Sequence, residues 1–143
     1  MAGFSLIADP QNTEYRVVRT SGSQAYTIGD AVMMDTTSDA VDVVPATASS
    51  TTVNIFGVAM ETIVSTTTSL LVCVATAAQS WVAPVTNTAN TNHNYQKMLL
   101  TDKVTVNNTG TTNTSANAVF TQLGVVSTNR IVGRFNVVAN VTA

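Results

Sequence analysis

The sequence predicts an all-β protein, and three observations support this fold class. First, 25 of the 143 residues are threonine and 22 are valine, two types that lose side-chain freedom in helices and pack well on a pleated sheet. Second, charged residues make up only 10% of the chain, against about a quarter in typical globular proteins. Third, short apolar runs recur at the spacing of a barrel or sandwich. We expect a single compact β-barrel or sandwich-like domain with an extended N-terminal arm and long polar loops.

Period-two alternation of apolar and polar residues places the individual strands. In "SLLVCVATA" (69–77) both faces are apolar, so that strand should be covered on both sides. In "IVGRFNVV" (131–138) one face carries Arg134 and Asn136, so that strand should be half exposed. The predicted strands are residues 15–19, 31–34, 41–44, 55–64, 70–75, 81–85, 97–100, 104–106, 118–126 and 131–138.

Residues 1–14 are predicted to form an extended arm ahead of a β-rich domain at 15–143. Gly3 and Pro10 interrupt this segment, and it is too short to build a core of its own. Its apolar residues Phe4, Leu6 and Ile7 are expected to contact a partner while contributing little to the folded domain. The alternative is that these residues add an edge strand to the domain itself.

Three polar, low-complexity stretches separate the strands: residues 45–52, 86–94 and 107–117. Each is too weakly periodic to offset its ordering entropy by burial, so we expect exposed loops. A short echo links "FGVAMETIV" (56–64) and "LGVVSTNRIV" (123–132), but it is too short to indicate duplication.

The sequence offers no catalytic set, and we expect no enzyme activity and no cofactor. The only cysteine, Cys73, lies in an apolar strand, where it is expected to be buried and unreactive. The only histidine, His93, lies in a polar loop, so a nucleophile–base pair between the two is disfavoured. One cysteine and one histidine also cannot complete a four-ligand zinc site.

One acidic cluster, made of Asp30, Asp35, Asp39 and Asp42, raises the question of calcium. It lacks the alternating carboxylates and final glutamate of an EF-hand loop, so turn formation is the favoured role and calcium the lesser alternative. Gly29 and Asp30 are typical of a turn that enters a strand. Trp81 is expected to fill the core rather than form a sugar-binding platform.

Charge and hydropathy limit the classes of partner that the sequence predicts. A net charge of −2 leaves no cation excess for a phosphate backbone, so no nucleic acid is expected. The N-terminus has no basic region, and no apolar stretch reaches 18 residues, so neither a secretory signal nor a membrane span is predicted.

The order "YTIGDAVMMDTTSDAVDVVP", then "NIFGVAMETIV", then "AVFTQLGVV" and "RIVGRF", resembles that of tailed-phage capsid decoration proteins, which stabilise the head. The resemblance implies a structural virion protein that binds the outside of the capsid and clamps neighbouring subunits of the major capsid protein. It also implies assembly in the host cytoplasm and self-association on the capsid surface, with a trimer as one option. A head-fibre or tail component is the alternative, and a carbohydrate-binding module ranks lowest.

Overall fold

The structure, a computed structural model, describes residues 3–8, 13–21, 24–35, 42–64, 69–109 and 118–137, and this part of the chain is almost entirely β. The predicted fold class is confirmed, and each of the ten predicted strands has a counterpart. The elements are β1 (Ser5–Ala8), β2 (Tyr15–Thr20), β3 (Ala31–Met34), β4 (Asp42–Pro45), β5 (Ile55–Ala59), β6 (Ser69–Val74), β7 (Ser80–Pro84), the 3-10 helix η1 (Thr91–His93), β8 (Lys97–Asp102), β9 (Thr105–Asn107), β10 (Phe120–Ser127) and β11 (Arg130–Phe135).

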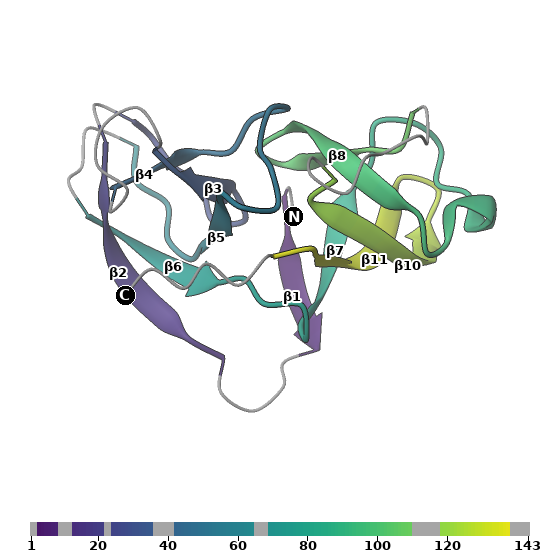
Figure 1. The fold of residues 1–143 in the computed structure, drawn as a ribbon, viewed down its shortest axis with the longest axis horizontal. Coiled ribbons are helices and arrows are strands. Elements are labelled where there is room, and N and C mark those ends of the chain that lie inside the picture. The colour runs from purple at the N-terminus through teal and green to yellow at the C-terminus, as the bar shows by residue number, and fades with distance from the viewer. Residues whose placement is uncertain are drawn as a thin grey trace.

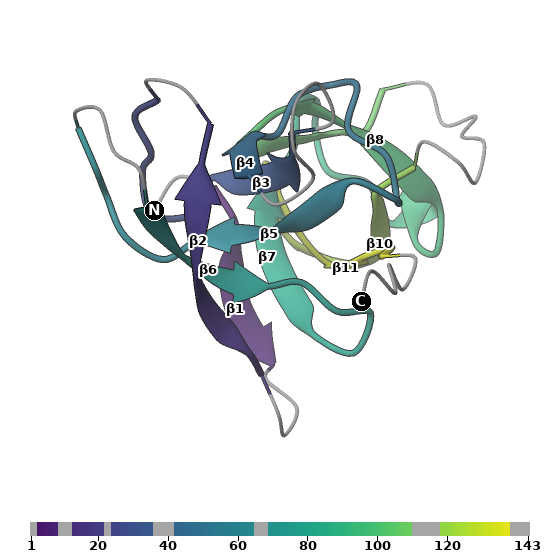
Figure 2. The same cartoon turned by 60° about the vertical axis from the view of Figure 1, so that its left-hand side comes forward.

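These strands form two units that lie side by side, with β1 between them (Figure 1). The first unit is a closed barrel in the order β2-β4-β3-β5-β6. Its strands β2, β5 and β6 come forward in Figure 2. The second unit is a sheet in the order β1-β7-β11-β10-β8-β9.

The second unit repeats the strand connectivity of the first. In the barrel, the first and third strands, β2 and β4, pair in parallel, and the other four pairings are antiparallel. In the sheet, β7 to β11 make the same four antiparallel pairings in the same order. A parallel bridge joins Val85, just after β7, to Val106 of β9. It corresponds to the parallel pairing of β2 with β4 in the barrel.

The short echo in the sequence falls partly on this repeat. Its two Gly-Val segments contain Gly57 in β5 and Gly124 in β10, the fourth strand of each unit. The Ile-Val segments do not correspond, because Ile63 precedes β6 whereas Ile131 lies within β11. The repeat is therefore one of topology, with little sequence in common.

The barrel strands supply side chains to two hydrophobic clusters because successive residues of a strand point to opposite faces. Val32, Ala59 and Val72 lie in a cluster confined to the first unit. Their neighbours Ala31, Val58 and Cys73 lie in a larger cluster together with Trp81, Phe120 and Phe135 of the second unit. The prediction that 69–77 is covered on both sides is confirmed, and the shared cluster makes the two units one domain.

The predicted turn at Gly29 and Asp30 is confirmed, and it joins the two units. Gly29 has a φ of 99°, which favours glycine. The Asp30 carboxylate, only 1% exposed, accepts a hydrogen bond from the Thr27 amide (3.0 Å). It also forms an ion pair with Lys103 of the second unit, with Nζ 3.2 Å from Oδ2. The Ala31 amide donates to the Lys103 carbonyl oxygen over 2.7 Å, so the contact involves backbone as well as side chains.

The predicted arm is wrong for the residues that the structure describes. Residues 5–8 form β1, which pairs with β7 in antiparallel register, so the edge-strand alternative is the correct one. Phe4 is 1% exposed in the shared core, and Leu6 packs against it. Only Ile7, at 57% exposure, points its side chain to solvent. The short segment gains its stability from β7 and from the aromatic core, neither of which its own sequence reveals.

Two smaller expectations also need correction. Residues 55–64 are not one strand, because β5 ends at Ala59 and only Ile63 pairs again, with Tyr26. The loop at 45–52 is only partly exposed, since Ala46, Ser50 and Thr52 are buried. The loop predicted at 86–94 is confirmed, since none of its residues is buried, and it contains the short η1, whose start is capped by Asn90. Most of the loop predicted at 107–117 lies outside the described residues.

Tyr26 gives the fold a pH dependence that can be measured. Burial, and to a lesser extent the nearby Asp30 charge, raises the pKa of Tyr26 to about 12. An unfolded tyrosine titrates near 10, so the stability that the neutral phenol contributes is complete below about pH 10 and is lost as the pH rises towards 12. We expect the free energy of unfolding to fall in this window. Denaturant titrations at pH 9 to 12 check this, and Tyr26→Phe should remove the part of the fall due to Tyr26.

Candidate functional site

The most distinctive polar arrangement is a row of three side chains on the outer face of the second unit. Thr121 of β10 lies directly opposite Lys97 of β8 and Arg134 of β11. The adjacent row, Met98, Phe120 and Phe135, is buried in the core. Because faces alternate along a strand, the Lys97–Thr121–Arg134 row is fixed on the opposite, outer face. The predicted half-exposure of 131–138 is thereby confirmed for residues 131–137.

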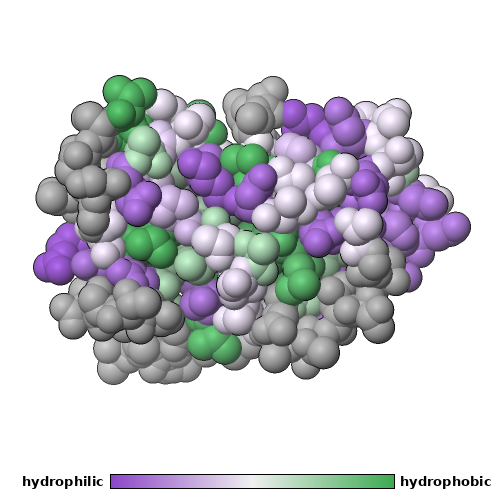
Figure 3. All heavy atoms as spheres, turned by 90° about the horizontal axis from the view of Figure 1, so that it is seen from above, coloured by the Kyte–Doolittle hydropathy of each residue, from purple (hydrophilic) through white to green (hydrophobic). Residues whose placement is uncertain are grey.

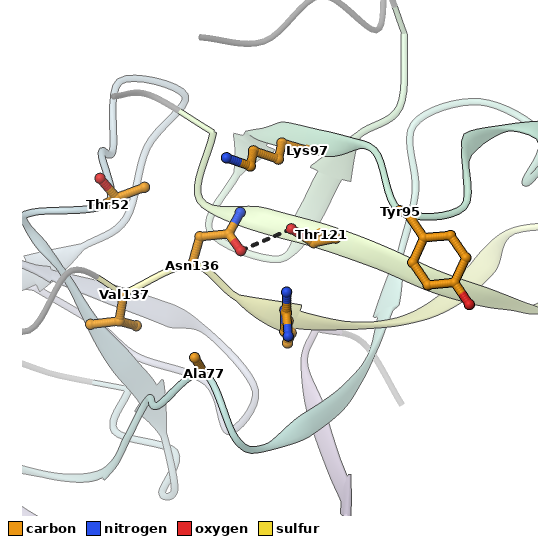
Figure 4. A pocket seen from close by; sticks show the side chains of 8 residues that line it. Thr52, Ala77, Tyr95, Lys97, Thr121, Asn136 and Val137 are labelled. Carbon is orange, nitrogen blue, oxygen red and sulfur yellow. Dashed lines mark hydrogen bonds between the residues drawn. The ribbon is translucent and has the colours of Figure 1, made fainter. Parts of the chain in front are cut away.

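This row lines an open pocket of about 490 Å³, whose walls also include Tyr95, Asn136 and Val137. Figure 4 shows the hydrogen bond between Thr121 and Asn136 in the middle of the pocket, with Tyr95 towards one end and Thr52 towards the other. The Thr121 hydroxyl donates to Asn136 Oδ1 (2.8 Å), and Asn136 Nδ2 donates to the Ala118 carbonyl oxygen (3.0 Å). These bonds hold the floor of the pocket in one arrangement.

Lys97 and Arg134 differ from three of the other basic residues. Arg16, Arg19 and Lys103 each form an ion pair with a carboxylate. Lys97 and Arg134 are exposed, and no carboxylate of the residues that the structure describes forms an ion pair with either of them. The pocket thus carries two positive charges that the described part of the chain does not neutralise.

Tyr95 adds an exposed aromatic side chain at the edge of the pocket. It is 77% exposed and adopts a φ of 68°, a left-handed conformation that is unusual for a bulky residue. The turn that follows η1 holds it there, since the Tyr95 amide donates to the Gln122 carbonyl oxygen over 2.6 Å. Backbone strain of this kind is often found at functional positions. Exposed tyrosine beside arginine is also a composition typical of protein interfaces.

The residues first considered for catalysis lie in different parts of the fold. Cys73 is completely buried in β6, as predicted, and its low reactivity stays a prediction. His93 lies in the polar loop, as predicted, where it is half-buried in η1, which contacts β10 of the second unit. Trp81 fills the core, as predicted, where its ring makes an edge contact with Phe135.

The acidic residues are separated by their roles in the fold. Asp30 pairs with Lys103, Asp42 pairs with Arg19, and Asp35 donates its amide to the Asp42 carbonyl oxygen at the end of the β3–β4 hairpin. Asp39 lies outside the described residues. In the part of the chain that the structure describes, no group of three or more His, Cys, Asp or Glu side chains is placed to hold a metal ion.

The sequence had indicated part of this site. The pattern of 131–138 predicts that Arg134 and Asn136 share one exposed strand face, but it does not connect Lys97, Thr121 or Tyr95 with them. The missing information is the register of β8 and β11 on β10, which local sequence does not specify. A signal was nevertheless present, because Lys97 and Arg134 are two of only six basic residues in the chain.

Elsewhere, the surface is mixed. Viewed from above, hydrophobic residues appear in several small groups among polar and neutral ones (Figure 3). Among the residues described, no helix has the length and apolar character needed to cross a membrane.

Comparison with known proteins adds no relative to this description. No protein-family model matches the chain, and no curated protein matches it.

Proposed function

We propose that this protein is a non-enzymatic capsid decoration protein of a tailed phage, which binds the outside of the head and stabilises contacts between major capsid subunits. The observation that carries the proposal is the pocket beside β8, β10 and β11. It combines an exposed tyrosine, two cations without a carboxylate partner in the described residues and a fixed polar floor. This is a surface suited to holding another protein.

The architecture is compatible with a structural role. The GDAV segment begins the β3–β4 hairpin and the GVA segment forms the end of β5, so the resemblance to decoration proteins falls on paired strands of the barrel. The Asp30–Lys103 contact ties this barrel to the second unit. The result is a compact two-unit body whose pocket opens to the surface, where a capsid subunit can reach it.

The test is binding to purified, expanded phage heads that lack the protein. We expect saturable co-sedimentation, with a plateau at a fixed number of copies per major capsid subunit. Unexpanded heads serve as the control for surface adsorption. Failure to co-sediment with expanded heads at any concentration would remove the main support for the proposal.

A head-fibre or tail role is the second candidate, because a resemblance of this kind also fits proteins that share its β-rich composition. Locating the density of the protein on intact virions separates the two. Decoration predicts density spread over the outer head surface, with copies clustered if the protein self-associates. A fibre or tail role predicts density at a vertex or on the tail.

A further inference from the structure

We propose that the Lys97–Thr121–Arg134 row binds a carboxylate side chain of the capsid partner, so that an acidic segment of that partner docks across β8, β10 and β11. This inference rests on the proposed function and specifies the contact that would carry it. It follows from five features of the pocket: its charge, its spacing, its hydrogen-bonding capacity, its walls and the place of this face in the repeated topology.

The charge and spacing suit one carboxylate. Residues directly opposite each other on adjacent strands are about 5 Å apart, so Lys97 and Arg134 flank Thr121 at about 10 Å from each other. Both side chains are long enough to reach towards the space above Thr121. Two like charges in one row repel each other unless an anion lies between them. A carboxylate there would accept charge-assisted hydrogen bonds from both cations.

The polar groups of the pocket also favour a ligand that accepts hydrogen bonds. The Thr121 hydroxyl proton is used by Asn136, and one amide proton of Asn136 is used by Ala118. Lysine and arginine offer only donors. The groups that remain to meet a ligand are therefore mostly N–H donors. An ammonium group offers them no acceptor and an amide offers one uncharged oxygen, whereas a carboxylate offers two charged ones.

The walls favour a protein segment over a free anion or a nucleic acid. Tyr95, Ala77 and Val137 provide aromatic and apolar surface around the cations, which suits the carbon atoms of an aspartate or glutamate and its neighbours. A phosphate backbone needs a run of cations, whereas this pocket has two and the chain has a net charge of −2.

Because the topology repeats, the same face exists in the first unit, where it packs against another part of the protein. In the first unit, the row Ala31–Val58–Cys73 crosses β3, β5 and β6, the second, fourth and fifth strands. All three residues are fully buried in the cluster shared with the second unit. In the second unit the same three strands are β8, β10 and β11, and their outer row is exposed at both ends. In the first unit this face is therefore buried against the rest of the chain. In the second unit the same face is exposed and carries two cations.

The experiment compares head binding by wild-type protein, the double variant Lys97→Gln/Arg134→Gln, and Arg16→Gln as a matched control. Arg16 is also an exposed cation, but it lies in β2 and already pairs with Glu14. We expect the double variant to bind at least tenfold more weakly and to lose most of the salt dependence shown by the wild type, while Arg16→Gln binds normally. All three proteins should melt at similar temperatures, because all three substituted side chains are exposed.

A second measurement tests the site without phage heads. A hexaglutamate peptide is titrated into ¹⁵N-labelled protein, with hexaglutamine and inorganic phosphate as comparisons. We expect amide shifts around residues 95–97, 121 and 134 with hexaglutamate alone. Equal shifts with phosphate, or none with hexaglutamate, would overturn the inference, as would unchanged head binding by the double variant. If wild-type protein fails to bind heads but the peptide result is as expected, the proposed function fails and the carboxylate site stands.

Discussion

Phe4→Ala is expected to lower the free energy of unfolding by about 3–5 kcal/mol, the cost of emptying a buried phenylalanine site. Phe4 is 1% exposed and its ring contacts two aromatic side chains of the second unit. Its ring centroid is 4.9 Å from that of Phe135 and 5.6 Å from that of Phe120. Small domains are stable by only about 5–15 kcal/mol, so this single truncation should remove a large share of the total.

The neighbouring residue Ile7 provides a matched control. It lies in β1, the strand that follows Phe4, but is 57% exposed, so Ile7→Ala should cost less than about 1 kcal/mol. Urea unfolding curves of the two variants and the wild type measure the difference. Equal stability of Phe4→Ala and wild type would mean that the N-terminal segment is an arm outside the domain, as the sequence alone had suggested.

This result also bears on how far the fold could be predicted. Strands β2 to β11 were predictable because each carries a short apolar run, continuous in β6 and alternating with polar residues in β11, which is a local signal. β1 has four residues, ends close to Pro10 and depends on two distant partners. Its backbone pairs with β7, and the Phe4 amide donates to the Gly29 carbonyl oxygen over 2.9 Å. No pattern within residues 1–14 encodes either partner.

The repeated connectivity was hidden for a related reason. Apart from the Gly-Val segments in β5 and β10, the two units share too few residues for the repeat to be read from sequence. What they share is the order in which strands pair, and pairing order is decided by which hydrophobic faces meet in the folded chain. Side chains as different as Val32 and Met98 serve equivalent strands, because each only needs to fill its own core.

The candidate site depends on register in the same way. Each of Lys97, Thr121 and Arg134 is an ordinary polar residue on the outer side of its strand. They become a row only because β10 pairs with β8 on one side and with β11 on the other, in the registers that place Thr121 opposite both cations. Composition could show that cations are few, whereas only the structure shows that two of them share a pocket.

The pairing of β10 with β11 is most sensitive to an added side chain at Gly133. Gly133→Ala is expected to lower the free energy of unfolding by about 3 kcal/mol or more. A Cβ atom added there would lie 2.2 Å from the Thr121 carbonyl oxygen and 2.4 Å from Cε2 of Phe120. Contacts this short cannot persist, and one of the two atoms belongs to the backbone of the paired strand. β10 and β11 must therefore move apart locally, and overpacking of a tight core costs typically about 1–3 kcal/mol and occasionally more.

Gly124→Ala is the matched control, because it places the same methyl group on the other strand of the same pair. There the nearest atom is a side-chain methyl, Val132 Cγ1, at 3.3 Å. A side chain can yield by a few tenths of an ångström, so the loss should stay below about 1 kcal/mol. Denaturant unfolding of both variants decides the comparison, and similar stabilities for the two would contradict the close approach at Gly133.

A third variant separates the two contacts at Gly133. Adding Phe120→Leu to Gly133→Ala removes the ring atom but leaves the Thr121 carbonyl oxygen in place. The part of the stability loss that comes from the clash with this backbone oxygen should therefore remain in the double variant. Because Thr121 and Arg134 adjoin this clash, Gly133→Ala should also weaken head binding under conditions where the variant is still folded. Gly124→Ala should bind heads like the wild type, which ties the register of β10 and β11 to the function of the Lys97–Thr121–Arg134 row.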